Sequence, residues 1–461
     1  MLFSSLTFLY VFLPAVLAVY FLVPARGRNF VLLGSSLVFY AYGEPVYTLL
    51  LIFSSVLDYV NGLIIEKKRG RWAAKAALGI SLAVNLGLLC FFKYTDFFIK
   101  NINAVFGSDI GLMGIALPIG ISFYTFQTMS YTIDVYRGSV PASHDFIGFA
   151  SYVCMFPQLV AGPIVRYSDI SASLYLRKTD VKGFSGGALR FVTGLAKKVL
   201  IANVLGELAQ KLSFTVSPTV FSEWIYAAAF TLQIYYDFSG YSDMAIGLGK
   251  MLGFSFPENF DHPFMSKSVS EFWRRWHMTL GGWFRDYVYI PLGGSRVKPL
   301  RRILNVLIVW ALTGFWHGAE WNFMAWGVYF AVFLVLEKFV WGNALKKCPA
   351  AAHIYTLFAV LISFVIFSAD MPQALIRLKN MFGAGGVPAF SAESLYYIKS
   401  YAVVLAAGAA GTLPLWAQTG RKISASRAGV AAEPVWCAVL IVLCTAFLIE
   451  GTFNPFLYFR F

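Results

Sequence analysis

The sequence predicts an all-α polytopic membrane protein, and three observations support this fold class. Of its 461 residues, 58% are hydrophobic and 13% are charged, whereas about 25% of residues are charged in soluble proteins. The mean hydropathy is +0.66. Lys and Arg occur in short clusters between long apolar runs, as in cytoplasmic loops. We therefore expect one integral-membrane domain over residues 1–461, surrounded by membrane lipids. The net charge of +14 indicates topology and not nucleic-acid binding.

The apolar runs between these clusters predict about 12 membrane spans with both termini outside. The first run, 5–23, lacks the basic flank of a signal peptide and is expected to remain as a helix. Because successive basic clusters must return to the cytoplasmic side, the following runs are paired into hairpins. These hairpins are 30–65, 76–92 with 112–134, 199–214 with 222–246, 303–340 and 354–417.

Three segments lie outside this hairpin pattern. The run 146–165 is interrupted by Pro157 and by a following Gly-Pro pair, so we expect it to be re-entrant. The charged region at about 255–301 is expected on the cytoplasmic side, with helices at the membrane interface. The last run, 434–450, should cross outward, so that residues 434–461 form a final span and an extracytoplasmic aromatic tail.

No soluble catalytic domain is expected, so the chemistry must lie among the spans. The five cysteines lie in or beside apolar stretches, and no C-x-x-C spacing occurs. This pattern supports neither a disulfide framework nor a metal site. No tightly bound cofactor is predicted.

His317 is the first candidate catalytic residue. It occurs in G-F-W-H-G-A-E-W (314–321), between two long apolar runs. An ionisable residue at membrane depth is costly and by default marks a functional site. The alternative, a neutral imidazole that is hydrogen-bonded between helices, stays open from this pattern alone.

A second group of candidates lies in S-E-F-W-R-R-W-H (270–277). If this stretch is helical, two tryptophans and a histidine share one face, with two arginines beside it. Such arginines can meet phosphate groups, but an interfacial anchor helix would show the same pattern. The candidates are Trp273, Arg274, Arg275, Trp276 and His277.

Three charged residues complete the set of candidates. Arg285 precedes a Gly-Gly turn and would either cradle an anionic cofactor or cap a helix. Asp237 and Asp243 interrupt an apolar run, where each carboxylate would cost about 3 kcal/mol at the centre of a membrane helix. Both should therefore face the protein interior and orient a histidine or an arginine.

Several blocks of the sequence resemble the bacterial polysaccharide branch of the membrane-bound O-acyltransferase family. The main blocks are Y-D-F-S-G-Y-S-D-M-A-I-G (236–247), S-E-F-W-R-R-W-H (270–277), R-D-Y-V-Y-I-P-L-G-G (285–294) and G-F-W-H-G-A-E-W (314–321). The opening M-L-F-S-S-L-T-F-L, the block F-P-Q-L-V-A-G-P-I (156–164) and the ending F-L-Y-F-R-F extend the resemblance to nearly the whole chain. It implies a ring of tilted helices around a central acyl-transfer tunnel. His317 matches the family's catalytic histidine, and His277 matches a second histidine that lines a cytoplasmic funnel.

The resemblance also implies a function. An acetyl group would pass from cytoplasmic acetyl-CoA, a co-substrate, across the bacterial inner membrane for O-acylation of an extracytoplasmic polysaccharide such as alginate or peptidoglycan. A periplasmic or secreted esterase-like partner is expected to act with the chain. Two other functions stay open: D-alanyl transfer to teichoic acid from a carrier protein, and transport of a small molecule without a covalent step.

The residue types suggest a mechanism for acyl transfer. Neutral His317 would accept the proton of an attacking hydroxyl. The oxyanion could be met by Asn322, by a backbone N–H or by a protonated His277. Water would be excluded by Trp273, Trp276 and Trp316. The phosphates of coenzyme A would be held by Arg274, Arg275 and Arg285, although lipid headgroups compete for that role.

The tail contributes one more candidate. Tyr458 stands among phenylalanines after the last apolar run, where an aromatic belt at the lipid interface would look the same. The tail also resembles the tyrosine-bearing ending of family members. Because a phenol can accept an acyl group and release it again, Tyr458 is expected to relay the acyl group.

Overall fold

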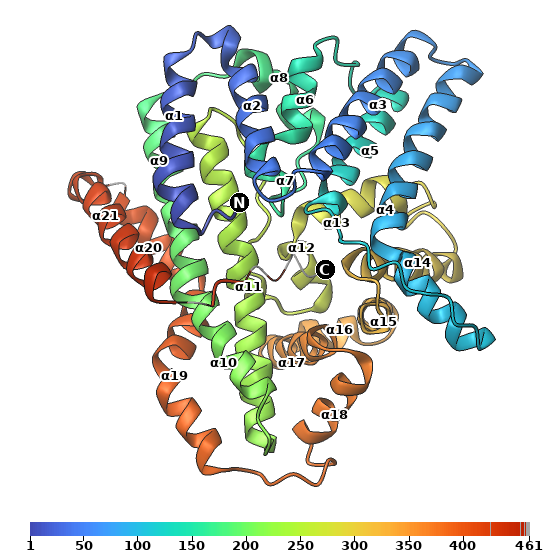
Figure 1. Cartoon of the computed structure of the whole chain (residues 1–461). Helices are drawn as coiled ribbons and strands as arrows, with labels where there is room; N and C mark the ends of the chain where they lie inside the picture. The colour runs from blue at the N-terminus through green and yellow to red at the C-terminus, as the bar shows by residue number, and fades with distance from the viewer. Residues whose placement is uncertain (425, 452, 456, 458–461) are drawn as a thin grey trace. The chain divides into compact units, whose positions relative to one another are not determined.

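The computed structural model of the chain describes residues 1–424, 426–451, 453–455 and 457, with the backbone alone at positions 417, 421 and 424. All regular structure in this part of the chain is helical (Figure 1). The chain divides into two compact units. Unit 1 comprises Met1–Phe191 and Met244–Pro257, and unit 2 comprises Val192–Asp243 and Glu258–Phe461.

Unit 1 is built from the helices at the start of the chain. They are η1 (Phe8–Phe12), α1 (Leu13–Leu22), η2 (Ala25–Gly27), α2 (Arg28–Ala41), α3 (Tyr47–Lys67), α4 (Trp72–Phe106), α5 (Ile121–Arg137), α6 (Phe146–Cys154), α7 (Phe156–Leu159), α8 (Tyr167–Leu176) and most of α9 (Val181–Ala196). Helix α3 packs against both α4 and α5. Nearly all of α5 is buried, so it forms the centre of this unit.

Unit 2 contains most of α11 (Val220–Met251) and the remaining helices. They are η3 (Lys197–Ala202), α10 (Asn203–Ser213), η4 (Pro263–Met265), α12 (Val269–Arg275), α13 (Met278–Phe284), η5 (Arg285–Tyr289), α14 (Pro299–His317), α15 (Trp321–Leu336), η6 (Glu337–Trp341), α16 (Gly342–Lys347), α17 (Pro349–Ser368), α18 (Met371–Met381), α19 (Ala392–Gly411), α20 (Pro414–Ser424) and α21 (Arg427–Glu450). The segments η3, η5 and η6 are π-helical, and η4 is a 3₁₀-helix.

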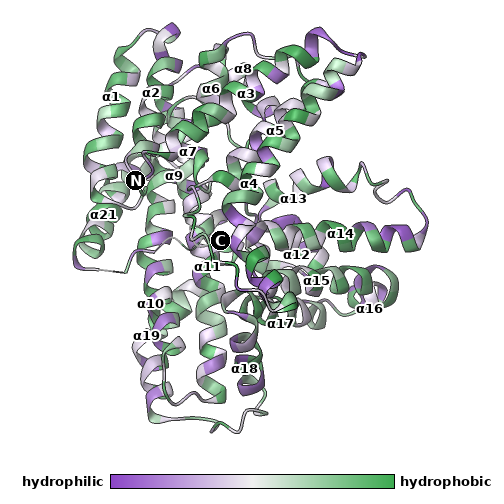
Figure 2. Cartoon of the chain, turned by 45° about the vertical axis from the view of Figure 1, so that its right-hand side comes forward, coloured by the Kyte–Doolittle hydropathy of each residue, from purple (hydrophilic) through white to green (hydrophobic). Residues whose placement is uncertain are grey.

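The helices include several that are long and apolar enough to cross a membrane. Among the described residues these are Tyr47–Lys67, Trp72–Phe106, Trp321–Lys347, Pro349–Ser368 and Arg427–Glu450. A bent pair, Ala392–Gly411 with Pro414–Gly420, would add another. Figure 2 shows hydrophobic residues along α1, α14 and α15, whereas α18 is more hydrophilic. The chain is therefore a multi-pass membrane protein, while the count of about 12 spans and the central tunnel stay predictions.

The apolar run 112–134 is not one helix, which corrects the sequence-based prediction. Helix α5 begins only at Ile121, and residues 107–120 form no helix. Gly120 has a φ of +76°, a left-handed conformation that favours glycine. A Cβ at this position would lie 2.5 Å from the backbone oxygen of Leu159, so the close approach also requires glycine.

The run 146–165 is broken, as Pro157 predicts. It forms the short helices α6 and α7, and the backbone between them is non-helical at Met155, with φ −52° and ψ 111°. Both helices are buried almost completely. Non-helical backbone at membrane depth is tolerated where protein surrounds it. The break is thus confirmed, and re-entry into the membrane stays a prediction.

Two glycines allow α14 and α15 to run side by side (Figure 1). A Cβ on Gly314 would lie 2.3 Å from the backbone oxygen of Phe323, and one on Gly327 would lie 2.3 Å from that of Trp310. Small residues at such contacts let membrane helices approach closely. The contact fixes the end of α14, where His317 is the last helical residue.

Candidate active site

The stretch 268–280 is not one continuous helix, because α12 ends at Arg275 and α13 begins at Met278. The prediction that Trp273, Trp276 and His277 share one helical face is therefore wrong. The sequence starts α12 with Ser268, whose side chain accepts a hydrogen bond from the backbone N–H of Glu271.

Glu337 holds the start of α12 from a different part of the chain. Its carboxylate accepts hydrogen bonds from the backbone N–H groups of Val269 (2.5 Å) and Ser270 (2.9 Å) and from the hydroxyl of Ser270 (2.6 Å). These bonds satisfy N–H groups that have no partner within a helix. Glu337 is buried, so η6 and α12 are joined by a buried, hydrogen-bonded contact next to the candidate residues.

His277 occupies a strained position in the bend between α12 and α13. Its φ of +44° and ψ of +52° lie in the left-handed region, which costs a non-glycine residue about 1–2 kcal/mol. Backbone bonds on either side hold this conformation: Asp261 N–H donates to the oxygen of Arg275 (2.9 Å), and Met278 N–H donates to that of Asn259 (3.0 Å). Such strain persists where the surroundings enforce it and is concentrated at functional sites.

Asn259 fixes the tautomer of His277. The side-chain oxygen of Asn259 lies 3.1 Å from Nδ1 of His277 and also accepts from the backbone N–H (3.3 Å) and hydroxyl (2.9 Å) of Thr279. Its amide nitrogen donates to Ser242 (3.1 Å). A backbone N–H only donates, so the Asn259 atom that faces both groups is the oxygen. Nδ1 of His277 must then carry the proton, and Nε2 of the neutral ring keeps its lone pair.

Burial lowers the pKa of His277 well below its ordinary value of 6.5, and positive charge on His317 lowers it further. The His277 side chain is 1% exposed. The ring is therefore neutral at neutral pH. This state argues against a protonated His277 as the oxyanion donor, which was one of the three alternatives open from sequence.

His317 is buried among aromatic rings at the end of α14. Its ring centroid lies 5.0 Å from that of Trp316, 5.1 Å from that of Trp326 and 5.4 Å from that of Phe367, each at a steep angle. The Trp316 ring also lies 6.0 Å from that of His277, so one tryptophan contacts both histidines. The structure thus brings together the two histidines that the sequence separates by a charged loop.

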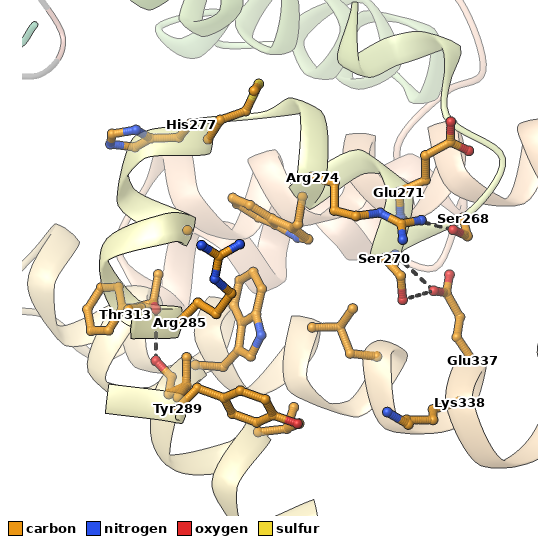
Figure 3. A pocket seen from close by; sticks show the side chains of 18 of the residues that line it. Ser268, Ser270, Glu271, Arg274, His277, Arg285, Tyr289, Thr313, Glu337 and Lys338 are labelled. Atoms are coloured by element: carbon orange, nitrogen blue, oxygen red, sulfur yellow. Dashed lines mark hydrogen bonds between the residues drawn. The ribbon is translucent and has the colours of Figure 1, made fainter. Parts of the chain in front are cut away.

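A cavity of about 1030 Å³ opens beside His277. Its walls come from α12, α13, η5, α14, α15, η6 and α16. In Figure 3, His277 lies at one end of the view and Glu337 and Lys338 at the other, with the guanidinium of Arg285 between them. Cofactor and ligand sites commonly enclose about 300–1,000 Å³, so the cavity is large enough for an extended donor molecule.

The cavity lining is positively charged. Its cationic residues are Lys267, Arg274, Arg285, Lys338 and Lys346, and its acidic residues are Glu271 and Glu337. Both acidic side chains are engaged within the protein: Glu337 at the start of α12, and Glu271 with Arg275 at 3.0 Å. The lining is thus suited to an anion.

The neighbouring arginines of α12 have different surroundings. Arg274 lines the cavity, and Figure 3 shows its side chain beside Glu271 and Ser268. Arg275 forms ion pairs with Glu271 and with Asp261 (3.1 Å) and is not among the lining residues. Arg275 was predicted to hold phosphate together with Arg274 and Arg285, but in the structure it does not line the cavity. Arg285 lines the cavity and pairs with Asp286 at 2.7 Å.

The predicted tryptophans also differ in whether they line the cavity. Trp273 lines the cavity and packs on Trp310, with ring centroids 4.6 Å apart. Trp276 is buried outside the cavity lining and stacks on Phe272 at 5.4 Å. Asn322, one of the three possible oxyanion donors, directs its amide nitrogen to the backbone oxygens of Ile366 and Phe367. It ties α15 to the end of α17.

The family model of the membrane-bound O-acyltransferases matches residues 138–370, a range that includes both histidines and the whole cavity. The chain belongs to the membrane-bound O-acyltransferase family.

Similar members of this O-acyltransferase family come from several bacteria. The protein named "Probable alginate O-acetylase AlgI" of Pseudomonas aeruginosa is 42% identical over 84% of this chain and 75% of its own length. The peptidoglycan O-acetyltransferase of Helicobacter pylori is 33% identical over 84% of this chain and 81% of its own length. The teichoic acid D-alanyltransferase of Bacillus subtilis is 26% identical over 54% of this chain and 68% of its own length.

In this O-acyltransferase, the two aspartates of α11 have unexpected partners. Asp237 pairs with Lys198 at 2.7 Å, and Asp243 pairs with Lys197 at 2.6 Å. The sequence-based expectation was a histidine or an arginine, whereas the structure shows a lysine as a partner of each; Asp237 is buried as predicted. Tyr458 lies outside the described residues.

Sequence reasoning missed Asn259 and Glu337 at the site and Lys198 outside it. Glu337 ends the apolar run V-F-L-V-L-E (332–337) and Lys198 begins another, so each carried the signal of a charge at the edge of an apolar run. Asn259 carried no comparable signal, because its role depends on the bend at His277.

Proposed function

We propose that the protein transfers an acetyl group from a cytoplasmic thioester donor to an extracytoplasmic polysaccharide. The observation that carries this proposal is the positively charged cavity that is lined by His277, whose ring shares the neighbouring Trp316 ring with buried His317. The relatives named for alginate and peptidoglycan O-acetylation support acetyl transfer and a polysaccharide acceptor. The protein would act in the bacterial inner membrane, so that donor and acceptor meet it from opposite sides.

Acetyl-CoA fits the chemistry of the cavity. Its phosphates would be held by Arg274 and Arg285, supported by Lys338. Its thioester would lie near His277, where Trp273 and the surrounding rings limit the access of water. Because acetyl-CoA is consumed in each turnover, it is a co-substrate and not a resident cofactor.

In the reaction, His317 acts as the general base. It takes the proton of an attacking hydroxyl while that oxygen bonds to the thioester carbonyl carbon. The carbon–sulfur bond then breaks, and the departing thiolate receives the proton from His317. Neutral His277, with its proton on Nδ1 and its lone pair on Nε2, positions the donor or accepts a hydrogen bond next to the reacting atoms. A backbone N–H is the remaining candidate for the oxyanion donor.

The first acceptor is proposed to be the phenol of Tyr458. Its oxygen would form a phenyl ester, and a hydroxyl of the esterase-like partner or of the polysaccharide would then attack that ester and release the phenol. Tyr458→Phe keeps the ring and removes the hydroxyl. We expect this variant to lose polysaccharide acetylation at equal protein level, whereas unchanged acetylation would leave Tyr458 as a belt residue.

Two other functions have less support. D-alanyl transfer has support from relatives that align with 54% of the chain. Small-molecule transport without a covalent step is at odds with membership of an acyltransferase family.

The experiment that tests the proposal follows the acyl group. Inverted membrane vesicles that contain the protein are given acetyl-CoA labelled either in the acetyl group or in the adenine. Acetyl label in polysaccharide or in a partner protein, without adenine label, is expected. Uptake of both labels into the vesicle lumen would instead indicate transport of the intact molecule.

A further inference from the structure

An almost completely buried ion pair lies in unit 2 and takes no part in the cavity. Nζ of Lys198 and Oδ1 of Asp237 are 2.7 Å apart, and their side chains are 4% and 1% exposed. Burying two charges costs several kcal/mol per ion, and the attraction between them repays this only when further hydrogen bonds satisfy both groups. Charges buried in membrane proteins are functional by default. The pair therefore requires an explanation that packing does not supply.

Local structure brings this pair together. Lys198 lies in the π-helical segment η3, and such segments occur frequently at functional sites. One turn after Asp237 on α11, a Cβ on Gly240 would lie 2.8 Å from the backbone oxygen of Gly194 and 3.2 Å from the backbone nitrogen of Lys198. Glycine at position 240 thus lets α11 approach η3 closely enough for the two side chains to meet.

Both members of the pair also contact the tail segment, which we define as the described residues 453–455 and 457. Nζ of Lys198 donates to the backbone oxygen of Pro455. Oδ2 of Asp237 accepts from the backbone N–H of Leu457 at 2.9 Å. The cation therefore binds a main-chain acceptor, and the anion binds a main-chain donor. These two main-chain groups are two residues apart in the tail segment.

Further contacts hold the same tail segment. Nδ2 of Asn203 donates to the side-chain oxygen of Asn454 at 3.1 Å. A Cβ on Gly206 would lie 2.7 Å from the ring of Phe453, so that ring packs directly on the backbone of α10. Leu457 is only 7% exposed. The tail segment is thus seated along η3, α10 and α11 by contacts on both sides of the ion pair.

We propose that Lys198 and Asp237 form a main-chain clamp that seats the tail segment and thereby positions the residue that follows it. The clamp binds backbone groups of the tail segment. It therefore fixes which tail residues lie at the ion pair, without selecting their side chains. Consecutive Cα atoms are about 3.8 Å apart, so anchoring Leu457 restricts the space that the phenol of Tyr458 can reach. This consequence for acyl transfer rests on the relay proposed above, whereas the seating of the tail does not.

The neighbouring pair offers a matched control. Lys197 and Asp243 come from the same two helices and lie 2.6 Å apart, with side chains 30% and 14% exposed. Neither Lys197 nor Asp243 takes part in the hydrogen bonds that hold Pro455 and Leu457. Removing this pair changes the charge in the same way and leaves the clamp in place.

Thiol reactivity tests the clamp independently of activity. In a variant with the five natural cysteines replaced by alanine, Leu457→Cys keeps the backbone N–H that Asp237 accepts. We expect this thiol to react slowly with a maleimide, and at least 10-fold faster when Lys198→Met and Asp237→Asn are added together. With Lys197→Met and Asp243→Asn instead, the rate should stay within 2-fold of the parent. Equal rates in the two double variants would overturn the clamp.

A second measurement covers the case in which the double variant fails to fold. Asp237→Asn alone keeps the size of the side chain, and its folded state is checked by elution profile and by protection of the buried Cys444 thiol in a background that retains it. Faster reaction at position 457 with unchanged Cys444 protection supports the clamp. Equal exposure of both thiols would show general unfolding and contradict a local clamp.

Acetylation of polysaccharide by the same variants separates the clamp from the relay. Loss of acetylation together with release of the tail supports both proposals. Release of the tail with unchanged acetylation would leave the clamp standing and contradict the relay through Tyr458.

Discussion

The side-chain oxygen of Asn259 lies 3.1 Å from Nδ1 of His277 and sets which ring nitrogen carries the proton. The same oxygen accepts from the backbone N–H of Thr279, which excludes the opposite orientation of the amide. Asn259 is 1% exposed and is held by Ser242 on its other side. A side chain that does not line the cavity thereby determines the chemical state of one that does.

Asn259→Ala is therefore expected to reduce kcat by about 10- to 100-fold, as is typical when a group that orients a functional histidine is lost. The KM for acetyl-CoA should change less, because the cavity cations remain. In protein labelled with ¹⁵N-histidine, the His277 signals should shift from one tautomer toward a mixture. Thr279→Val removes one donor to the same oxygen and serves as the control, with kcat expected within 3-fold of the wild type. An unchanged tautomer in Asn259→Ala would contradict this role.

The two adjacent arginines of α12 should give opposite results. Arg274→Ala removes a cavity cation and is expected to raise the KM for acetyl-CoA about 10-fold, as losing one charge-assisted hydrogen bond does. Arg275→Ala breaks its ion pairs with Glu271 and Asp261 and should lower the apparent Tm without a comparable rise in KM. Arg301→Ala, at an exposed position outside the cavity, is the control. Equal KM changes in Arg274→Ala and Arg275→Ala would show that the cavity does not bind the phosphates.

Burial of neutral His277 predicts how stability depends on pH. Its pKa is lowered in the folded protein and lies near 6.5 in the unfolded chain, so the unfolded state binds more protons below that pH. Stability is therefore lost as the pH falls below about 6.5, by up to about 1.4 kcal/mol per pH unit. His277→Gln removes this titration. Between pH 7 and pH 5, the apparent Tm of the wild type should fall more than that of His277→Gln. An equal fall in the two proteins would contradict the depressed pKa.

The topology of the last helix can be tested at its end. The basic residues before α21 predict that Arg427–Glu450 crosses outward. Asn454 is a poor site for a probe because it is half-buried and bonded to Asn203, whereas Gly451 is exposed. In a background without natural cysteines, Gly451→Cys should react with an impermeant thiol reagent in spheroplasts. Reaction only after lysis would place this end in the cytoplasm.

Composition and periodicity were sufficient to predict the helical membrane class and the pairing of α14 with α15, because apolar runs of this length have few alternative structures. They were insufficient at residues 268–280. The helical pattern there continues through His277, but the backbone bonds from Asn259 and Asp261 turn the chain at that point. Contacts with a distant segment override local periodicity, and a single sequence does not display them.

For a related reason, some residues of the candidate site could be predicted from the sequence, whereas the partners of others could not. His277, His317 and Arg274 carried signals in their own neighbourhoods, and the structure brings the two histidines together around Trp316. The partners of Asp237 and Asp243 depended on how η3 packs against α11, so a histidine or an arginine was expected where lysines occur. Residue type predicts burial and charge pairing better than it predicts the identity of the partner.

The central claim is that His317 performs proton transfer in an acyl-transfer reaction. The most direct measurement is the initial rate of acetyl transfer from labelled acetyl-CoA by the His317→Ala variant, at a protein level and apparent Tm matched to the wild type. The account predicts a loss of at least 100-fold with little change in acetyl-CoA binding, because general acid–base catalysis contributes about 10²- to 10⁴-fold. A transfer rate within a few-fold of the wild type would show that His317 is a packing residue and would contradict the account.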